Sequence, residues 1–325
     1  VNDCLMMEDP WYYRNKVQVP VGNHHGKLVT GFYKQHSNDI VPMETCFIQN
    51  EMSNQLVNRT RELLEKYHES AYDKEKHAGN IKHILVKYAN STHELMLVLI
   101  TYKKHIQSID KIVNTLTNEF PQLKTVIHNV NPRHDNVILG EEVHVLYGQG
   151  YIEDNLLGNT YRISTKSFYQ VNPIQVELLY QRAIDFAQLS ENDVVIDAYC
   201  GIGTISLSLA KYVKKVYGVE IVEQAIIDAK ENAKRNGIEN VEFICQDAGE
   251  FMVKFAKKNK HIDQLCMLAP QRIVYISCDV ATQARDIAYL QEQGYYAEKC
   301  QPVDMFPHSF HIENIVQLSY QKSTD

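Results

Sequence analysis

The sequence predicts an α/β protein in which a doubly wound, mostly parallel sheet follows an α+β domain. Two observations indicate this fold. Strand-like runs dominate the chain up to about residue 170, whereas strands and helices alternate strictly, with short links, beyond it. Clustered strands with a few helices are typical of α+β domains, and strict alternation is typical of parallel sheets with helical crossovers. We therefore expect an α+β domain over residues 1–170 and a doubly wound domain over residues 171–325.

The expected elements of the first domain begin with a hairpin, because two strand-like runs flank a turn at residues 22–26. A helix is expected next, because leucines recur on one helical face. In order, the predicted elements are strands Trp11–Val21 and Lys27–Tyr33, helix Met52–Lys76, strands Ile81–Tyr88 and Glu94–Tyr102, helix Ile106–Leu116, strand Leu123–Val130, and short strands Val143–Tyr147 and Thr160–Ile163.

The second domain begins with a helix at Asn172, where Pro173 suits a first turn. In order, the elements that follow are strand Val194–Asp197, helix Thr204–Tyr212, strand Lys215–Glu220, helix Val222–Asn236, strand Val241–Cys245, helix Gly249–Lys258, strand Arg272–Ser277, helix Ala281–Gln293, and the antiparallel pair Tyr295–Val303 and His311–Tyr320. One strand is missing after Lys258, because a right-handed crossover needs strand, helix and strand. We therefore expect the chain to be interrupted between Asp263 and Gln264.

The composition is that of an ordinary folded protein. Hydrophobic residues make up 44% and charged residues 22% of the chain, which excludes disorder as the main state. No apolar run approaches the roughly 18 residues of a membrane helix, so no membrane partner is expected. The net charge of −7 excludes a uniformly basic surface but allows local basic patches. No feature implies a protein partner.

The cysteines predict a reducing compartment. There are seven, an odd number, without Cys-x-x-Cys spacing and without a secretory signal. We therefore expect reduced thiols and a cytoplasmic protein. Because the chain begins at Val1 rather than at Met, we also expect that a segment precedes it.

A glycine turn after the first strand of the second domain indicates a cofactor site. Asp197 ends the strand, Gly201 and Gly203 allow close backbone approach, and a helix begins just beyond. Glu220 and Asp247 end the next two strands. A carboxylate before the turn suits a cationic amino group, and one at the second strand end suits ribose hydroxyls. Together the acids predict S-adenosylmethionine, although each alone could equally be a helix cap.

A cysteine and a glutamate are the candidates for chemistry. Cys278 ends a strand, where ligands of open α/β sheets bind, and the following helix start favours a thiolate. The alternative is a buried small residue. Glu313 enters an apolar strand, where burial would raise its pKa and suit it as a general base; a surface position is the alternative. His308 and His311 are too few for a metal site, so hydrogen-bonding or structural roles are favoured and no metal is expected.

Four motifs together resemble the bacterial RNA (uracil-5-)-methyltransferases across essentially the whole chain, closest to the 23S ribosomal RNA branch, with the tRNA branch as the near alternative. These motifs are Ser167–Pro173, Asp197–Thr204, Ser277–Cys278 with Ala281–Asp286, and Met305–His308 with His311–Glu313. The resemblance implies a Rossmann-like, S-adenosylmethionine-dependent methyltransferase sheet preceded by an α+β RNA-binding domain. RNA is the implied partner, with rRNA favoured over tRNA.

The resemblance also implies roles for residues. The thiolate of Cys278 adds to C6 of uracil, C5 takes the methyl group, and Glu313 removes the C5 proton. A soft anion is needed at C6 because C5 is otherwise a poor nucleophile. The implied cofactor residues are Gln170, Asp197, Tyr199, Gly201, Gly203, Glu220 and Asp247. Phe168 is placed where the family stacks the extruded base, and His308 is a further candidate for substrate contact.

Local basic residues must make the RNA contacts on an acidic chain. Arg14 and Lys16 lie among aromatic residues that begin at Trp11, and Arg133 is a further candidate. Aromatic faces stack bases and cations hold phosphates. An ordinary amphipathic strand is the alternative for this segment.

The sequence departs from the family pattern in three ways. The family's Asp-Pro-Pro-Arg motif is absent, at the place of the expected interruption, and Asp279-Val280 replaces the usual Asn-Pro. Cys46 matches the fourth ligand of the iron–sulfur cluster that some members carry, but the other three would precede Val1, so no cluster is expected in this chain. A noncatalytic RNA-binding protein and a small-molecule or amino-group methyltransferase remain alternatives.

Overall fold

The computed structural model describes residues 1–258 and 270–321 of the chain, and these divide into two compact units. One unit comprises residues 11–155 and 162–166, and the other comprises residues 1–10, 156–161 and 167–325. Because short segments alternate between the units around residues 156–167, the predicted boundary at residue 170 stays a prediction. The expected interruption between Asp263 and Gln264 lies outside the described residues.

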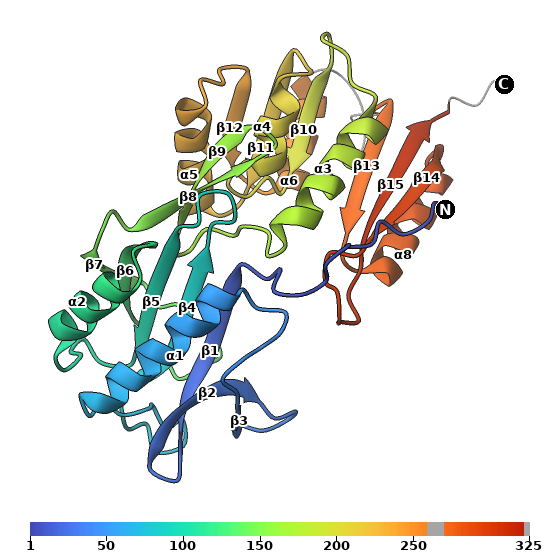
Figure 1. The fold of residues 1–325 in the computed structure, drawn as a ribbon. Helices are drawn as coiled ribbons and strands as arrows, with labels where there is room; N and C mark the ends of the chain where they lie inside the picture. Colours follow the sequence, from blue (N-terminus) through green and yellow to red (C-terminus); the bar gives the residue numbers. More distant parts are fainter. Residues whose placement is uncertain (259–269, 322–325) are drawn as a thin grey trace. The chain divides into compact units, whose positions relative to one another are not determined.

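The first unit is built on a seven-stranded sheet with the order β3-β2-β1-β4-β5-β6-β7 (Figure 1). Its elements are β1 (Lys16–His24), β2 (Lys27–Tyr33), β3 (Ile40–Pro42), α1 (Glu51–Lys66), β4 (Ile81–Tyr88), β5 (Leu95–Thr101), α2 (Ile109–Glu119), β6 (Leu123–Val130) and β7 (Glu142–Tyr147). β5 and β6 are parallel, and the other neighbours are antiparallel. Apolar side chains of α1 and α2 pack with those of the sheet in one core.

The helix predicted over Met52–Lys76 is wrong at its end, because α1 stops at Lys66. Tyr67 is the C-cap, and the next residue, His68, takes a left-handed conformation with φ 61°. The amide of His68 donates to the Glu65 carbonyl at 3.0 Å, and the amide of Glu69 donates to the Leu64 carbonyl at 2.9 Å. This is a Schellman ending, which glycine usually makes. With histidine in that place, the sequence carries no stop signal.

The second unit contains a parallel sheet with the order β10-β11-β12 and an antiparallel sheet with the order β13-β15-β14. The elements around the parallel sheet are α3 (Pro173–Ala187), β10 (Val194–Ala198), α4 (Thr204–Ala210), β11 (Lys215–Glu220), α5 (Glu223–Arg235), β12 (Val241–Cys245) and α6 (Ala248–Lys258). Those of the antiparallel sheet are β13 (Arg272–Ser277), α8 (Val280–Glu292), β14 (Tyr295–Val303) and β15 (Glu313–Tyr320). The strand–helix alternation confirms the predicted α/β class.

Local sequence explains where the helices of this unit begin. Asn172 is the N-cap of α3 and accepts from the Gln175 amide at 3.2 Å, with Pro173 in the first turn. Asp279 is the N-cap of α8 and accepts from the Thr282 amide at 3.0 Å. Such side chains satisfy amides that a helix start leaves unpaired. In the described residues, no helix is long and apolar enough to cross a membrane.

The hairpin of β8 (Tyr151–Leu156) and β9 (Asn159–Ser164) includes a strand that the sequence did not predict. The inward positions of β8 are Ile152, Asp154 and Leu156. Asp154 is fully buried and accepts from the Asn90 amide at 3.1 Å and the Ser91 amide at 2.8 Å. A buried carboxylate at an inward position hides the period of two that marks a strand.

Candidate active site

The glycine turn after β10 is held in a conformation that few residues adopt. Tyr199, Gly201 and Gly203 have φ angles of 65°, 55° and 84°. A Cβ at Gly203 would lie 2.7 Å from the Phe243 ring, so only glycine fits there. Space over Gly201 is open. Tyr199 is 75% exposed, and a non-glycine residue at this φ stores strain of about 1–3 kcal/mol, which is found most often at functional sites.

Buried tyrosines anchor the helix start that follows the turn. The Tyr161 hydroxyl donates to the Thr204 carbonyl at 3.1 Å, and the Tyr180 hydroxyl lies 3.0 Å from Thr204 Oγ1. Burial raises the pKa of Tyr161 to about 12 and raises that of Tyr180 further, so both stay protonated. Tyr180 also hydrogen-bonds Gln170, which links this predicted cofactor residue to the turn. Neither tyrosine was predicted to belong to the site, because tyrosines that pack in a core have no distinguishing pattern in the sequence.

Asp197 has a hydrogen-bond partner that was not predicted from the sequence. Ser206 Oγ donates to Asp197 Oδ2 at 2.5 Å, and Ser206 is fully buried in α4. Burial raises the pKa of Asp197 to about 6, although the Ser206 hydrogen bonds act in the opposite direction. In the sequence, Ser206 stands where a Gly-x-Gly-x-x-Gly pattern that begins at Gly201 would have its last glycine. The feature of the sequence that could have indicated this hydrogen bond is that Ser206 lies nine residues after Asp197.

The other two strand-end acids contact backbone amides. Glu220 accepts from Ile221 and Val222 at 2.8 and 3.0 Å, and its second oxygen accepts from the Gly201 amide at 3.3 Å. Asp247 accepts from the Glu250 amide at 3.0 Å in the first turn of α6. The contacts of these two carboxylates therefore agree with the alternative interpretation, in which each acid caps nearby backbone amides. That they bind a cofactor stays a prediction.

The register of the antiparallel sheet brings Cys278 and Glu313 together. Ser277, the last residue of β13, pairs with Asn314 of β15. Cys278 follows Ser277 and Glu313 precedes Asn314, so the two lie opposite each other at the same end of the ladder. Cys278 is exposed, directly before the N-cap of α8. Glu313 is 8% exposed, and burial raises its pKa to about 7, in the direction that its apolar context predicts.

The loop between β14 and β15, which leads into Glu313, exposes an aromatic ring. The Ser309 amide and hydroxyl both donate to the Phe306 carbonyl, at 3.1 and 2.7 Å, and the His311 amide donates to Ser309 Oγ at 3.2 Å. His308 has a φ of 64°. The Phe310 side chain is completely exposed, and Phe168 of the same unit is 67% exposed. No role was predicted for Phe310 from the sequence.

The predicted RNA-contacting residues of the first unit do not form one patch. Arg14 Nε donates to the Lys16 carbonyl at 3.3 Å, and burial and the Arg14 charge lower the pKa of Lys16. Lys16 pairs with Lys87 near the end of β4. At the start of β4, Ile81 pairs with Thr101 of β5, and Thr101 in turn pairs with the last residue of β6. Arg133 follows β6 and is therefore at the opposite end of the sheet. It forms an ion pair with Asp135.

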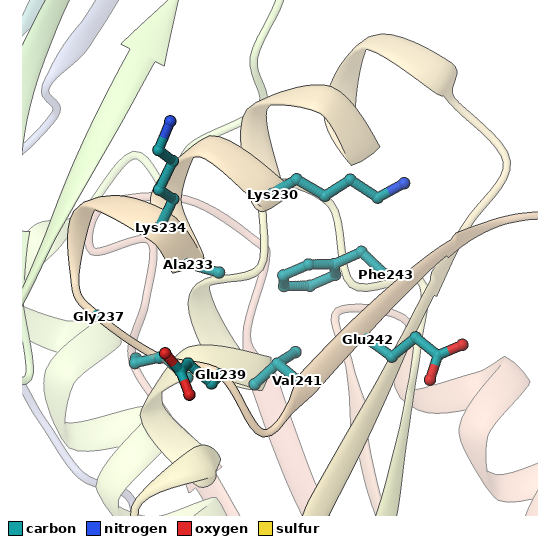
Figure 2. A pocket seen from close by; sticks show the side chains of 9 residues that line it. Lys230, Ala233, Lys234, Gly237, Glu239, Val241, Glu242 and Phe243 are labelled. Carbon is teal, nitrogen blue, oxygen red and sulfur yellow. The ribbon is translucent and has the colours of Figure 1, made fainter.

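Two further features do not add to the site. Figure 2 shows a pocket between α5 and β12, lined by Lys230, Lys234, Glu242 and Phe243 among others. It contains none of the residues predicted to bind cofactor or substrate, and we assign it no role. Among residues 1–258 and 270–321, no group of three or more histidine, cysteine or acidic side chains could hold a metal ion.

Comparisons with known proteins agree on the class of protein. The solved tRNA (uracil-54, C5)-methyltransferase of Pyrococcus abyssi superposes with a TM-score of 0.80 over 97% of this chain and 78% of its own, at 23% identity, which confirms the fold. Two relatives described as uncharacterized RNA methyltransferases are much closer in sequence. The Oceanobacillus iheyensis protein is 42% identical over 99% of this chain and 74% of its own length, and the Listeria innocua protein is 45% identical over 98% and 74%.

The alignment with the Oceanobacillus relative spans 341 positions, which exceeds the 325 residues of this chain, so the relative contains residues without a counterpart here. The family model of the tRNA (uracil-5-)-methyltransferases matches residues 5–268. Because this match covers most of the chain and the relatives cover nearly all of it, the chain belongs to the tRNA (uracil-5-)-methyltransferase family.

Proposed function

We propose that this protein methylates C5 of a uridine in 23S ribosomal RNA, with Cys278 as the nucleophile and Glu313 as the base. The observation that carries the proposal is the register of β13 and β15. It sets an exposed thiol opposite a buried carboxylate with a pKa of about 7. Uracil needs these two groups on adjacent carbons, because the nucleophile adds at C6 and the proton leaves from C5.

The cofactor is S-adenosylmethionine, as family membership and the solved relative with bound S-adenosyl-L-homocysteine support. When bound, it supplies an electrophilic methyl group. The residues of this chain fit it, because Asp197, Glu220 and Asp247 stand at successive strand ends and the backbone at Gly201 is open to a ligand. In this proposal Asp197 attracts the amino group, Glu220 the ribose, and Asp247 lies near the adenine. Gln170 and Tyr199 border the same turn.

The chain's own groups then move one electron pair and one proton. The Cys278 thiolate attacks C6 of a uracil that has been rotated out of the stacked RNA, and a C6–S bond forms as the ring becomes an enolate. After C5 has accepted the methyl group, the Glu313 carboxylate takes the C5 proton. The electrons of that C–H bond restore the C5–C6 double bond, and the C6–S bond breaks to return the thiolate. With a pKa near 7, Glu313 can accept and release a proton at neutral pH.

Exposed aromatic rings are suited to hold the RNA on this unit. Phe168 and Phe310 expose rings on which bases can stack, and His308 lies in the same loop as Phe310. Arg14 and Lys16 supply cations on the other unit. Arg133 is the weaker candidate, because Asp135 balances its charge. The proposed compartment is the cytoplasm, since the cysteines of the described ranges are free thiols.

The test compares two transcripts and two cysteine variants. Unmodified transcripts of 23S rRNA and of tRNA are incubated with methyl-labelled S-adenosylmethionine, and 5-methyluridine is quantified by nucleoside analysis. We expect label in the rRNA, none with Cys278→Ala, and full activity with Cys245→Ala. Cys245 is a matched control because it is also exposed and ends β12.

Each other outcome has its own meaning. Label in tRNA alone would favour the tRNA branch, and label in both would show a broader enzyme. An active Cys278→Ala protein would refute the covalent mechanism and favour a methyltransferase of another substrate. RNA binding without any label would favour the noncatalytic alternative.

A further inference from the structure

A buried pair of side-chain amides joins the two strands that carry Cys278 and Glu313. Gln283 lies in the first turns of α8 and is 1% exposed, and Asn314 is the second residue of β15 and is 7% exposed. Gln283 Nε2 donates to the Tyr275 carbonyl at 2.9 Å and to the Asn314 carbonyl at 3.2 Å. Asn314 Nδ2 donates in return to Gln283 Oε1 at 2.7 Å.

The placement of these bonds matters more than their number. Tyr275 belongs to β13, which leads into Cys278, and α8 begins directly after Cys278. Asn314 adjoins Glu313 in β15. The Gln283 side chain lies on the helix that follows Cys278. It hydrogen-bonds both the strand that precedes Cys278 and Asn314, the residue next to Glu313.

Asn314 is held from its other side as well. Cys300 of β14 donates its thiol to Asn314 Oδ1 at 3.3 Å. The Asn314 amide thus contacts α8 through its nitrogen and β14 through its oxygen. Buried polar groups with partners on both sides have a strongly preferred orientation, because any rotation leaves a donor or acceptor unpaired. The backbone at Asn314, and with it the adjoining Glu313, is correspondingly fixed relative to β13.

We propose that Gln283 is a positioning residue that fixes Glu313 relative to the Cys278 thiol. This inference rests on the proposed function, since it concerns the same uracil chemistry. Addition at C6 requires only that the thiol reach the base. Proton removal requires in addition that the Glu313 carboxylate stand within hydrogen-bond reach of the C5 proton while Cys278 holds C6. Loss of the Gln283 amide should therefore slow proton removal more than addition.

The experiment compares Gln283→Leu with Gln317→Leu. Gln317 is a matched control because it is a fully buried glutamine of β15 whose amide bonds Glu298 of β14 instead of α8 or β13. Each variant is assayed on an unmodified 23S rRNA transcript for kcat, for KM of RNA, and for S-adenosylmethionine affinity. Protein–RNA adducts that survive denaturation are isolated, and their uracil is analysed for the methyl group. Melting temperatures are measured in parallel.

For Gln283→Leu we expect kcat to fall at least about tenfold, because small displacements of a reacting group have large effects on rate. KM for RNA and cofactor affinity should stay within about twofold, and methylated adduct should accumulate. Gln317→Leu should keep kcat and show no adduct at a comparable melting temperature. If Gln283→Leu matches Gln317→Leu both in kcat and in the absence of adduct, the positioning role is overturned. Absence of 5-methyluridine with the unchanged protein would overturn the proposed function, and the positioning role with it.

Discussion

The two sheets of the second unit present their functional ends in opposite ways. At the ends of β10, β11 and β12, each of the three carboxylates accepts hydrogen bonds from a nearby hydroxyl or backbone amide. At the end of β13 and the start of β15, Cys278 is exposed, and burial raises the pKa of Glu313 to about 7. The parallel sheet thus holds three carboxylates oriented by hydrogen bonds, which suits binding. The antiparallel sheet holds an exposed thiol beside a carboxyl group whose raised pKa lets it change protonation near neutral pH, which suits the chemistry that we propose.

The largest expected effect that tests this contrast is that of Glu313→Gln. The amide cannot accept the C5 proton, so addition and methyl transfer occur but the cysteine is not released. We expect turnover to fall by about 10³-fold or more, within the range for loss of a catalytic base, and a denaturation-resistant adduct with methylated uracil to accumulate. Gel electrophoresis of labelled RNA with the protein measures the adduct.

Glu298→Gln is the matched control for this change, because Glu298 is an exposed carboxylate of β14 in the same sheet. It should behave as the unchanged protein. Normal turnover of Glu313→Gln, or an adduct that persists when Cys278 is also replaced by alanine, would contradict the assignment of base and nucleophile.

The next largest effect is expected on binding at the parallel sheet. Asp197→Asn keeps an acceptor for Ser206 but removes the negative charge, so affinity for S-adenosylmethionine should fall by about 10–100-fold, as for loss of a charge-assisted hydrogen bond. The pH dependence has a defined sign. Because burial raises the pKa of Asp197 to about 6, the carboxyl group becomes protonated as pH falls through that value and affinity declines. Isothermal titration between pH 5 and 8 measures both effects.

The same substitution at the other end of β10 is the control. Asp193 precedes the strand and accepts from the Ser190 amide at 2.7 Å. Asp193→Asn should leave affinity and its pH dependence intact. An Asp197→Asn protein whose affinity still declines below pH 6 would show that another group causes the dependence.

A smaller effect should follow from Ser206→Ala. The hydroxyl stabilises the ionised form of Asp197, so its removal should raise the pKa of that carboxyl further and move the decline in cofactor affinity to higher pH. At pH 7 we expect a loss of only a few-fold, consistent with one hydrogen bond of about 1 kcal/mol. Ser208→Ala, which removes a hydroxyl bonded to the Thr204 carbonyl in the same helix, should not move the midpoint.

The sequence predicted those parts of the site that depend on local order. Asp197, Glu220 and Asp247 end successive parallel strands, so their common edge follows from the alternation of strands and helices. Cys278 and Glu313 were singled out separately, but their register could not be predicted from the sequence, because 34 residues, including a helix and a further strand, lie between them. Gln283 and Asn314 were missed for the same reason, since a buried amide carries no pattern that reveals a partner 31 residues away.

The differences between the predicted and the observed elements arise at individual residues. The left-handed ending of α1 at His68 and the inward Asp154 of β8 both depart from the residues that usually mark a helix end or a strand face. β3 was also missed, because it has three residues, ends in proline and pairs only with β2. In each case a hydrogen bond or a neighbour formed in the folded chain decides the structure, and these are partners that local propensity does not contain.

The smallest expected effect concerns stability rather than activity, and it separates the two sheets by pH. Glu313 has a folded pKa of about 7 against an ordinary value of 4.5, so the folded state favours the protonated form. Its contribution to stability is therefore fully present below pH 4.5 and is lost as pH rises toward and through 7. Above pH 7 the folded protein contains a buried ionised carboxylate, which lowers its free energy of unfolding.

Glu313→Gln removes that cost, so its melting temperature should exceed that of the unchanged protein at pH 8 and exceed it by less at pH 5.5. Each kcal/mol corresponds to about 2–4 °C in a protein of this size. The exposed Glu298→Gln control should show the same small difference at both values of pH. Asp197 also has a raised pKa, but Asn at that position keeps the Ser206 bond, so Asp197→Asn should gain stability mainly between pH 4 and 6. Calorimetric scans at pH 5.5 and 8 distinguish the two, because only the Glu313→Gln gain should increase appreciably across this interval. Equal gains at both pH values for Glu313→Gln would mean that its carboxyl group titrates below pH 5.5 and is a poor proton acceptor at the site.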